Sequence, residues 1–146
     1  MYRLPRRMID ETISILRSCG AGERECQLYW ASSWAEPSIL TRVIHPDHQS
    51  NFGGVVLDSA WISNLWAELA DQNLGVRVQV HTHPGEAFHS KTDDEYPLIH
   101  EAGFLSLVIP EFALGPVRLE RAYLTEIQPN GSWRQVTVEE RLAIDD

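Results

Sequence analysis

Three side chains of the kinds that bind metal ions lie close together in the sequence: His81, His83 and Asp93. Residues two apart on a β-strand share one face and lie about 6–7 Å apart, so the two imidazoles can reach one ion. Pro84-Gly85 turns the chain back after the second histidine, which allows the carboxylate of Asp93 to complete the site. Two histidines and one carboxylate leave a fourth position of zinc open for a water molecule, whose pKa the metal lowers to about 7. The pattern predicts a hydrolytic metal centre.

The same residues also have an ordinary structural interpretation. His-x-His on a strand is more often a pair of surface histidines than a pair of ligands, and Thr92 with Glu95 fits the capping box of a helix. Asp94 is an alternative to Asp93 as the ligand. A carboxylate at the start of a helix is held rigidly, so both interpretations of the acidic run are compatible. The order of histidines, strand, chain reversal and acid favours the metal site.

The flanking sequence predicts the elements that position these side chains. Residues 76–83 alternate as in a strand, with the valines on one face and Arg77, Gln79 and both histidines on the other. Helical periodicity predicts helices over about 6–18 and from Asp58 or Ser59 to Asn73. The other expected elements are strands at 25–31, 39–44, 55–57 and 104–109, a loop at 45–54, a helix at 93–100, a hairpin of 118–127 with 133–138, and a terminal helical turn at 139–144. This mixture predicts one α+β domain spanning 1–146, with a mixed β-sheet flanked by helices.

Composition and charge exclude several classes of partner. Twenty-one acidic residues against twelve basic ones give a formal charge of −9, which argues against binding to nucleic acid. No apolar stretch approaches the ~18 residues of a membrane helix, and none of signal-peptide length follows the N-terminal arginines. Two cysteines, Cys19 and Cys26, are too few for a disulfide framework. We therefore expect a cytoplasmic protein without a membrane partner, in which both cysteines are reduced and fill the core.

His81-Thr82-His83-Pro84 followed by Ser90-x-x-Asp93 resembles the motif of the JAMM (JAB1/MPN/Mov34, MPN-plus) zinc metalloproteases. The expected order of elements is similar to that family along most of the chain, and the compact length is similar to its prokaryotic JAB-like branch. The resemblance implies an MPN-domain fold with cytidine-deaminase-like layering. It also implies that His81, His83 and Asp93 bind one catalytic zinc ion (Zn2+) and that Ser90 helps to stabilise the oxyanion.

The resemblance further implies an upstream glutamate that acts as the general base, taking a proton from the zinc-bound water and passing it to the leaving amine. We assign Glu25 to this role because it begins the expected strand at 25–31 and points away from its apolar face. Leu28 stands where the family usually has a small residue, and Glu23, on the same face, is the alternative base. The remaining histidines match no position of the motif and stay unassigned: His45, His48, His89 and His100.

The resemblance implies a zinc-dependent peptidase or isopeptidase that cleaves the amide bond after the C-terminal tail of a ubiquitin-like protein. Deubiquitinase-like cleavage of a conjugate, processing of a precursor and trimming of a sulfur-carrier protein all fit, and E1/E2-like proteins of the same pathway are further candidate partners. The acidic charge suits a basic ubiquitin-like partner. A non-catalytic MPN-type scaffold is the alternative function. Two other zinc hydrolase classes fit poorly: metallo-β-lactamase-like proteins need an acid at the position of Gly85, and amidohydrolase barrels need roughly 200 or more residues.

Overall fold

The computed structural model describes the chain except for residues 46–47, 52–53, 58, 86–97, 116 and 146, and describes 48–51, 54–57, 59–61 and 120 by their backbone alone. Its helices are α1 (Arg6–Gly20), α2 (Ser59–Asp71) and α4 (Val138–Arg141), with 3-10 turns at Glu111–Ala113 and Leu119–Arg121. Its strands are β1 (Tyr2–Pro5), β2 (Gln27–Ser33), β3 (Leu40–Ile44), β4 (His48–Asn51), β5 (Gly54–Leu57), β6 (Leu74–Thr82), β7 (Leu105–Ile109), β8 (Tyr123–Ile127), β9 (Trp133–Val136) and β10 (Leu142–Asp145).

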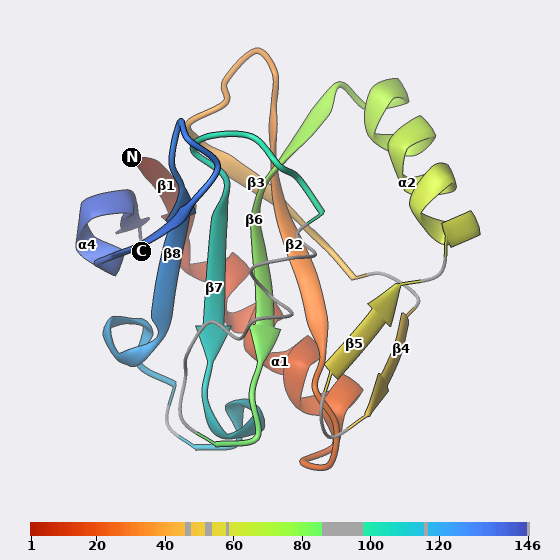
Figure 1. Ribbon diagram of the computed structural model, residues 1–146, viewed down its shortest axis with the longest axis vertical. Helices are drawn as coiled ribbons and strands as arrows, with labels where there is room; N and C mark the ends of the chain where they lie inside the picture. The colour runs from red at the N-terminus through yellow and green to blue at the C-terminus, as the bar shows by residue number, and fades with distance from the viewer. Residues whose placement is uncertain (46–47, 52–53, 58, 86–97, 116, 146) are drawn as a thin grey trace.

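The centre of the molecule is a six-stranded sheet with the strand order β3-β2-β6-β7-β8-β9 (Figure 1). Strands β6 and β7 are parallel, and the other neighbours in this sheet are antiparallel. The parallel pair requires a crossover, which carries the chain out of the sheet between residues 82 and 105. The predicted α+β fold with a mixed sheet flanked by helices is confirmed.

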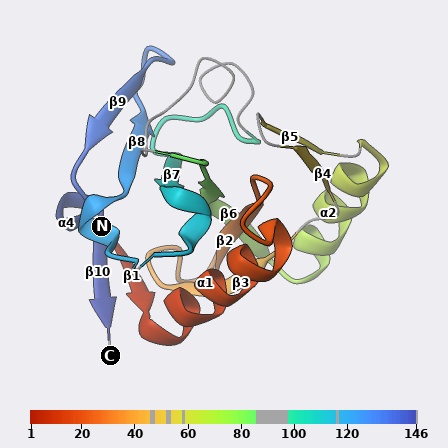
Figure 2. The same ribbon diagram turned by 90° about the horizontal axis from the view of Figure 1, so that it is seen from below.

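Helix α1 covers one face of this sheet (Figure 2). Pro5 precedes its first residue, and Ala21, in the left-handed conformation at φ 50°, ends it by donating its N–H to Arg17 O. The apolar stripe of the helix packs on alternate residues of the strands, and the indole Nε1 of Trp30 donates a buried hydrogen bond of 2.9 Å to Thr12 Oγ1. This bond joins the middle of α1 to β2, because Trp30 points to the helix side of the sheet.

Helix α2 packs against the other face through Leu65 and Leu69, which join Tyr29 and Phe104 in a second apolar cluster. Trp66, next to Leu65 in the helix, is 41% exposed. Helix α2 therefore meets the sheet along a stripe narrower than its apolar face.

Several elements depart from the sequence-based expectations. The expected loop at 45–54 contains β4, which pairs with β5 as an antiparallel hairpin. The expected terminal helical turn is short and continues into β10, which pairs in parallel with β1. The strand expected from 118 begins only at Tyr123, after a 3-10 turn. Of the expected helix at 93–100, residues 93–97 lie outside the described residues. Residues 98–100 are described and are not helical. Strand β10 could not be predicted locally, because its partner β1 lies at the opposite end of the chain and the two pair only in the folded molecule.

Within the described part of the chain, no helix is both long and apolar enough to cross a membrane.

Candidate metal centre

His81 and His83 lie together at the C-terminal end of β6, one of the two central strands of the sheet. His81 is the next-to-last residue of this strand, facing Gln27 of β2 and Val108 of β7 across the sheet. The ring centroids of the two histidines lie 5.1 Å apart, with a tilt of 52° between the ring planes. The residues are 3% and 4% exposed, so they are not the surface pair of the ordinary interpretation. The sheet therefore holds two converging imidazoles where β6 ends.

The backbone around His83 is fastened on both sides after the strand has ended. Its N–H donates to Ile109 O at 3.0 Å, and its carbonyl accepts from Phe112 N at 2.9 Å. Two residues later, Gly85 O accepts from Glu111 N at 3.0 Å. These bonds continue the pairing of the two chain segments past the ends of β6 and β7. His83 is therefore held as firmly as a strand residue, although it lies outside β6.

The turn that makes these bonds is conformationally strained. The three residues of Glu111–Ala113 all have left-handed backbone angles, with φ of 56°, 53° and 59°, and none is glycine. Each such residue costs about 1–2 kcal/mol, and such strain is concentrated at functional sites. Arg17 of α1 stabilises the turn by donating hydrogen bonds to Ala113 O at 2.7 Å and to Gly115 O at 3.0 Å. Through this turn, helix α1 helps to hold the backbone of His83 in place.

Glu25 reaches the two histidines from the segment that leads into β2. The strand begins at Gln27, two residues later than the expected range, so Glu25 precedes it. Glu25 is 8% exposed, and its Oε1 lies 4.0 Å from His83 Nε2, beyond direct hydrogen-bond distance. The alternative, Glu23, is exposed to solvent. Of the two candidate bases, Glu25 is the one that the fold brings beside the histidine pair.

The position of Glu25 depends on the residue that follows it. Cys26 N–H donates to Thr82 Oγ1 at 2.9 Å, and Thr82 N–H donates to Cys26 O at 3.1 Å. Thr82 lies between the two histidines in the chain, so this pair of bonds ties the glutamate-bearing segment directly to the histidine-bearing strand. Side chains alternate along extended chain, which turns Glu25 and Cys26 to opposite sides.

The histidine face of β6 is enclosed rather than solvent-exposed. Gln79 is 3% exposed and donates to Ser106 Oγ at 3.1 Å, while its Oε1 accepts from Leu98 N at 3.4 Å. On the neighbouring strand, Gln27 Nε2 donates to Tyr29 Oη, and burial raises the pKa of the Tyr29 phenol, which therefore stays neutral. Because these groups are buried, little water screens the site, which strengthens electrostatic interactions within it.

The described donors fit a zinc ion. Two buried imidazoles whose ring centroids lie 5.1 Å apart, with a buried carboxylate 4.0 Å from one of them, offer the nitrogen and oxygen donors that zinc accepts. The other residues assigned from the motif, Ser90 and Asp93, lie outside the described residues, as does Asp94. His89 also lies outside them, and only the backbone of His48 is described.

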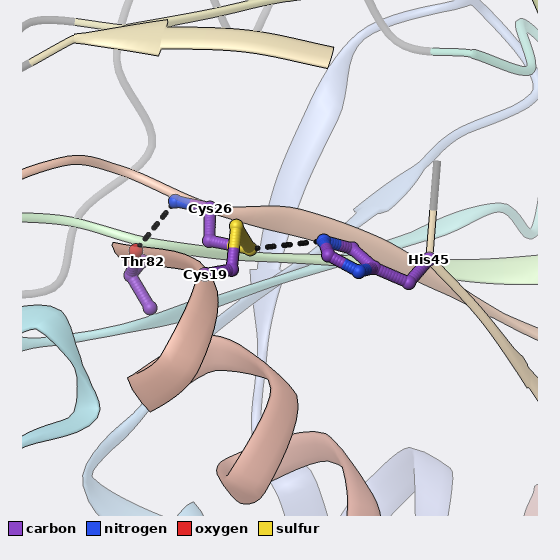
Figure 3. The surroundings of a disulfide bond; sticks show 4 residues. All are labelled: Cys19, Cys26, His45 and Thr82. Carbon is purple, nitrogen blue, oxygen red and sulfur yellow. Dashed lines mark hydrogen bonds between the residues drawn. A yellow bond between two sulfur atoms is a disulfide. The ribbon is translucent and has the colours of Figure 1, made fainter. Parts of the chain in front are cut away.

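The remaining assignments concern the cysteines and the other histidines. Cys19 and Cys26 are joined by a disulfide bond (Figure 3), so the expectation that they are reduced is wrong, whereas their expected place in the core is confirmed: Cys26 belongs to the apolar cluster and Cys19 packs against it. Cys19 lies near the end of α1, and the reversal at 21–24 returns the chain to Cys26, which no periodicity of the sequence reveals. His45, left unassigned, is exposed and lies at this bridge, with its Nε2 3.4 Å from Cys26 Sγ. His100 is exposed as well.

No protein-family model matches the chain. The chain is 29% identical over 140 residues to the probable metalloprotease y4jG of Sinorhizobium fredii, a match that covers 91% of this chain and 85% of the relative.

Solved structures with the same architecture cover almost the whole chain. A JAB1/MPN domain protein from Archaeoglobus fulgidus covers 99% of this chain and 97% of its own, with a TM-score of 0.57 and 12% identity. A protein from Desulfitobacterium hafniense reaches a TM-score of 0.69 at 14% identity, covering 100% of this chain and 94% of its own. One from Salinibacter ruber reaches 0.58 at 15% identity, covering 98% and 92%. The resemblance drawn from the motif is confirmed at the level of the fold: the chain has the architecture of a JAB1/MPN domain protein and is similar in sequence to a probable metalloprotease.

Proposed function

We propose that this JAB1/MPN-like protein is a zinc-dependent peptidase or isopeptidase that cleaves the amide bond after the C-terminal tail of a ubiquitin-like protein. Its fold and its sequence relationship to a probable metalloprotease support a metal-dependent peptidase. The observation that carries the proposal is the buried carboxylate of Glu25, which lies 4.0 Å from His83 Nε2 and beside the converging pair of imidazoles. A buried acid next to two metal-binding histidines is the arrangement that a metal-assisted hydrolysis needs.

Each residue has a defined part in this reaction. His81 and His83 would hold the metal together with Asp93, and zinc, when bound, would supply a water molecule of pKa near 7 and would polarise the scissile carbonyl. Glu25 accepts the proton of the attacking water and passes it to the leaving amine. The hydroxyl of Ser90 donates a hydrogen bond to the oxygen on which negative charge develops. The burial of Glu25 and both histidines excludes bulk water from these transfers.

The substrate class is proposed from the motif and from charge. The formal charge of −9 favours association with a basic partner, because the opposite charges of the two proteins steer them together. Conjugates and precursors of ubiquitin-like proteins both present such a tail, and a sulfur-carrier protein presents a similar one. E1/E2-like proteins of the same pathway are proposed as further partners.

The test uses two glutamates that lie two positions apart in the sequence but differ in burial. The purified protein is loaded with zinc, its metal content is measured by mass spectrometry, and fusions of ubiquitin-like proteins are offered as substrates. Glu25→Gln is expected to lower the rate of cleavage about 10²–10⁴-fold while zinc is retained, because a general base is not a ligand. Glu23→Gln is the matched control and is expected to cleave at the rate of the unmodified protein, because its side chain is exposed.

Two further results complete the test. His83→Ala is expected to lose both zinc and cleavage, because it removes a ligand. Cleavage that persists in Glu25→Gln would refute the assignment of the base. A protein that binds no zinc and cleaves none of the fusions would refute the peptidase and favour the non-catalytic MPN-type scaffold.

A further inference from the structure

A second group of potential metal ligands lies at the junction of α1, β2 and β3. Cys19 comes from the last turn of α1, Cys26 directly precedes β2, and His45 directly follows β3. One ligand atom of each residue lies within 4.8 Å of the other two, and His45 Nε2 is 3.4 Å from Cys26 Sγ. Figure 3 shows the imidazole of His45 directed at the two sulfur atoms from the opposite side to Thr82. Three segments of the chain therefore bring two sulfur atoms and one imidazole nitrogen to one point.

The chemistry of these donors is specific to a small group of metals. Thiolate sulfur and imidazole nitrogen bind Zn²⁺ and related soft or borderline ions, whereas Mg²⁺ and Ca²⁺ require oxygen ligands. The Cα atoms of Cys19 and Cys26 lie 6.0 Å apart. That separation suits a disulfide, and it also allows two thiolates to reach one zinc ion at about 2.3 Å each. A disulfide by itself does not need an imidazole beside its sulfur atoms.

The group is separate from the histidine pair of the candidate active site. Cys26 packs in the apolar cluster on the α1 side of the sheet, whereas the preceding residue, Glu25, lies beside His83 on the other side. The two places are linked through Thr82, which is hydrogen-bonded to Cys26 and lies between the two histidines in the chain. His45 is exposed, so this second group can be reached from solvent.

We propose that Cys19, Cys26 and His45 form a second metal site that binds Zn²⁺ when the disulfide is reduced. Three protein ligands leave the fourth zinc position to water or to an exchangeable ligand. Both states of the site, disulfide and zinc complex, link the end of α1 to the start of β2. The segment that carries Glu25 is therefore held in either state.

A trialkylphosphine is the reductant that converts the disulfide into the two thiols that bind zinc. The phosphine gives two electrons to the disulfide, the Sγ–Sγ bond breaks, and a water molecule supplies the oxygen of the phosphine oxide and the two protons of the thiols. Zn²⁺ then binds both sulfur atoms and His45, and the two thiol protons are released to solvent.

The experiment exploits the absence of sulfur from the ligands assigned to the active site. The full chain is reduced with the phosphine, freed of metal and titrated with Co²⁺, and the absorption spectrum is recorded. A sulfur-to-cobalt charge-transfer band in the near ultraviolet is expected, and Zn²⁺ is expected to abolish it by displacing the cobalt. The histidine pair contributes no sulfur, so His83→Ala is expected to retain the band. The non-reduced protein is expected to show none.

Substitutions within the cluster identify the ligands. Cys19→Ser is expected to weaken the band with Co²⁺, because it removes one of the two sulfur ligands. His45→Ala is expected to weaken Co²⁺ binding at least about tenfold, because even the loss of a residue behind a ligand costs 10–100-fold in affinity. His100→Ala removes another exposed histidine and is expected to bind Co²⁺ like the unmodified protein. Circular dichroism confirms that each variant is folded before titration.

Two results would overturn the proposal. The first is a reduced, folded protein that shows no charge-transfer band with Co²⁺. The second is a band of equal strength and midpoint in His45→Ala and His100→Ala, which would show that the imidazole is not a ligand.

Discussion

Thr82→Val tests the bond that joins the Glu25 segment to the histidine strand. Thr82 is 1% exposed, and its Oγ1 accepts the N–H of Cys26 at 2.9 Å. Valine has nearly the same shape and also favours a strand, so the substitution removes the acceptor without opening a cavity. The backbone N–H of the fully buried Cys26 then loses its partner. The effect of this substitution on stability is therefore set by one hydrogen bond.

The expected magnitude follows from the burial of both groups. Leaving a buried donor without an acceptor costs about 1–3 kcal/mol, so the free energy of unfolding is expected to fall by that amount. The matched control is Thr125→Val in β8 of the same sheet. Thr125 is 3% exposed, and its Oγ1 has no hydrogen-bond partner among the described residues. Removing that hydroxyl is expected to change the free energy of unfolding by less than about 1 kcal/mol, or to raise it.

The assay is equilibrium unfolding in urea, followed by tryptophan fluorescence, for the two variants and the unmodified protein. Equal slopes of the unfolding free energy against urea would show that the variants differ in stability alone. The reasoning is refuted if Thr82→Val is no less stable than Thr125→Val. A second readout is the rate of cleavage of a ubiquitin-like fusion, which Thr82→Val is expected to lower more than Thr125→Val, because one of the two hydrogen bonds that hold the Glu25 segment to β6 is lost.

Three other predictions concern the bridge, an ion pair and the metal. Cys19→Ala opens the loop closed by Cys19–Cys26, whose ends are 7 residues apart, and is expected to cost about 2.5 kcal/mol in urea unfolding without reductant and far less with reductant. Hydrogen bonds from Arg141 hold the pKa of Glu126 below its ordinary value, so the stability from this pair is present at neutral pH and lost as the pH falls through that lowered pKa. Glu126→Gln is therefore expected to be less stable at neutral pH and to lose less stability on acidification in unfolding measured across the pH range. Added zinc is expected to raise the melting temperature of the chelator-treated, non-reduced protein but not of His83→Ala, in a thermal scan of both.

The elements with strong local periodicity could be predicted from the sequence. The alternation at 76–83 predicted β6 and the side of the strand on which its histidines lie, and the apolar stripe after Pro5 predicted α1. One detail of β6 was wrong: Val76 packs in the cluster with Tyr29, apart from Val78 and Val80. The pairing of β2 with β6 shifts register at Trp30/Ala31, and strict alternation in the sequence does not reveal such a bulge.

The sequence by itself determined the types of the candidate ligands and their local order along one strand. It left Glu23 and Glu25 equivalent, because residues two apart share a face of an extended chain. Only the tertiary structure distinguishes their positions. Cys26 is hydrogen-bonded to Thr82, which brings Glu25 close to His83, while Glu23 is exposed to solvent. Only tertiary structure joined Cys19 to Cys26 beside His45. Contacts between elements far apart in the sequence depend on how the helix and strands pack, and no local pattern records that packing.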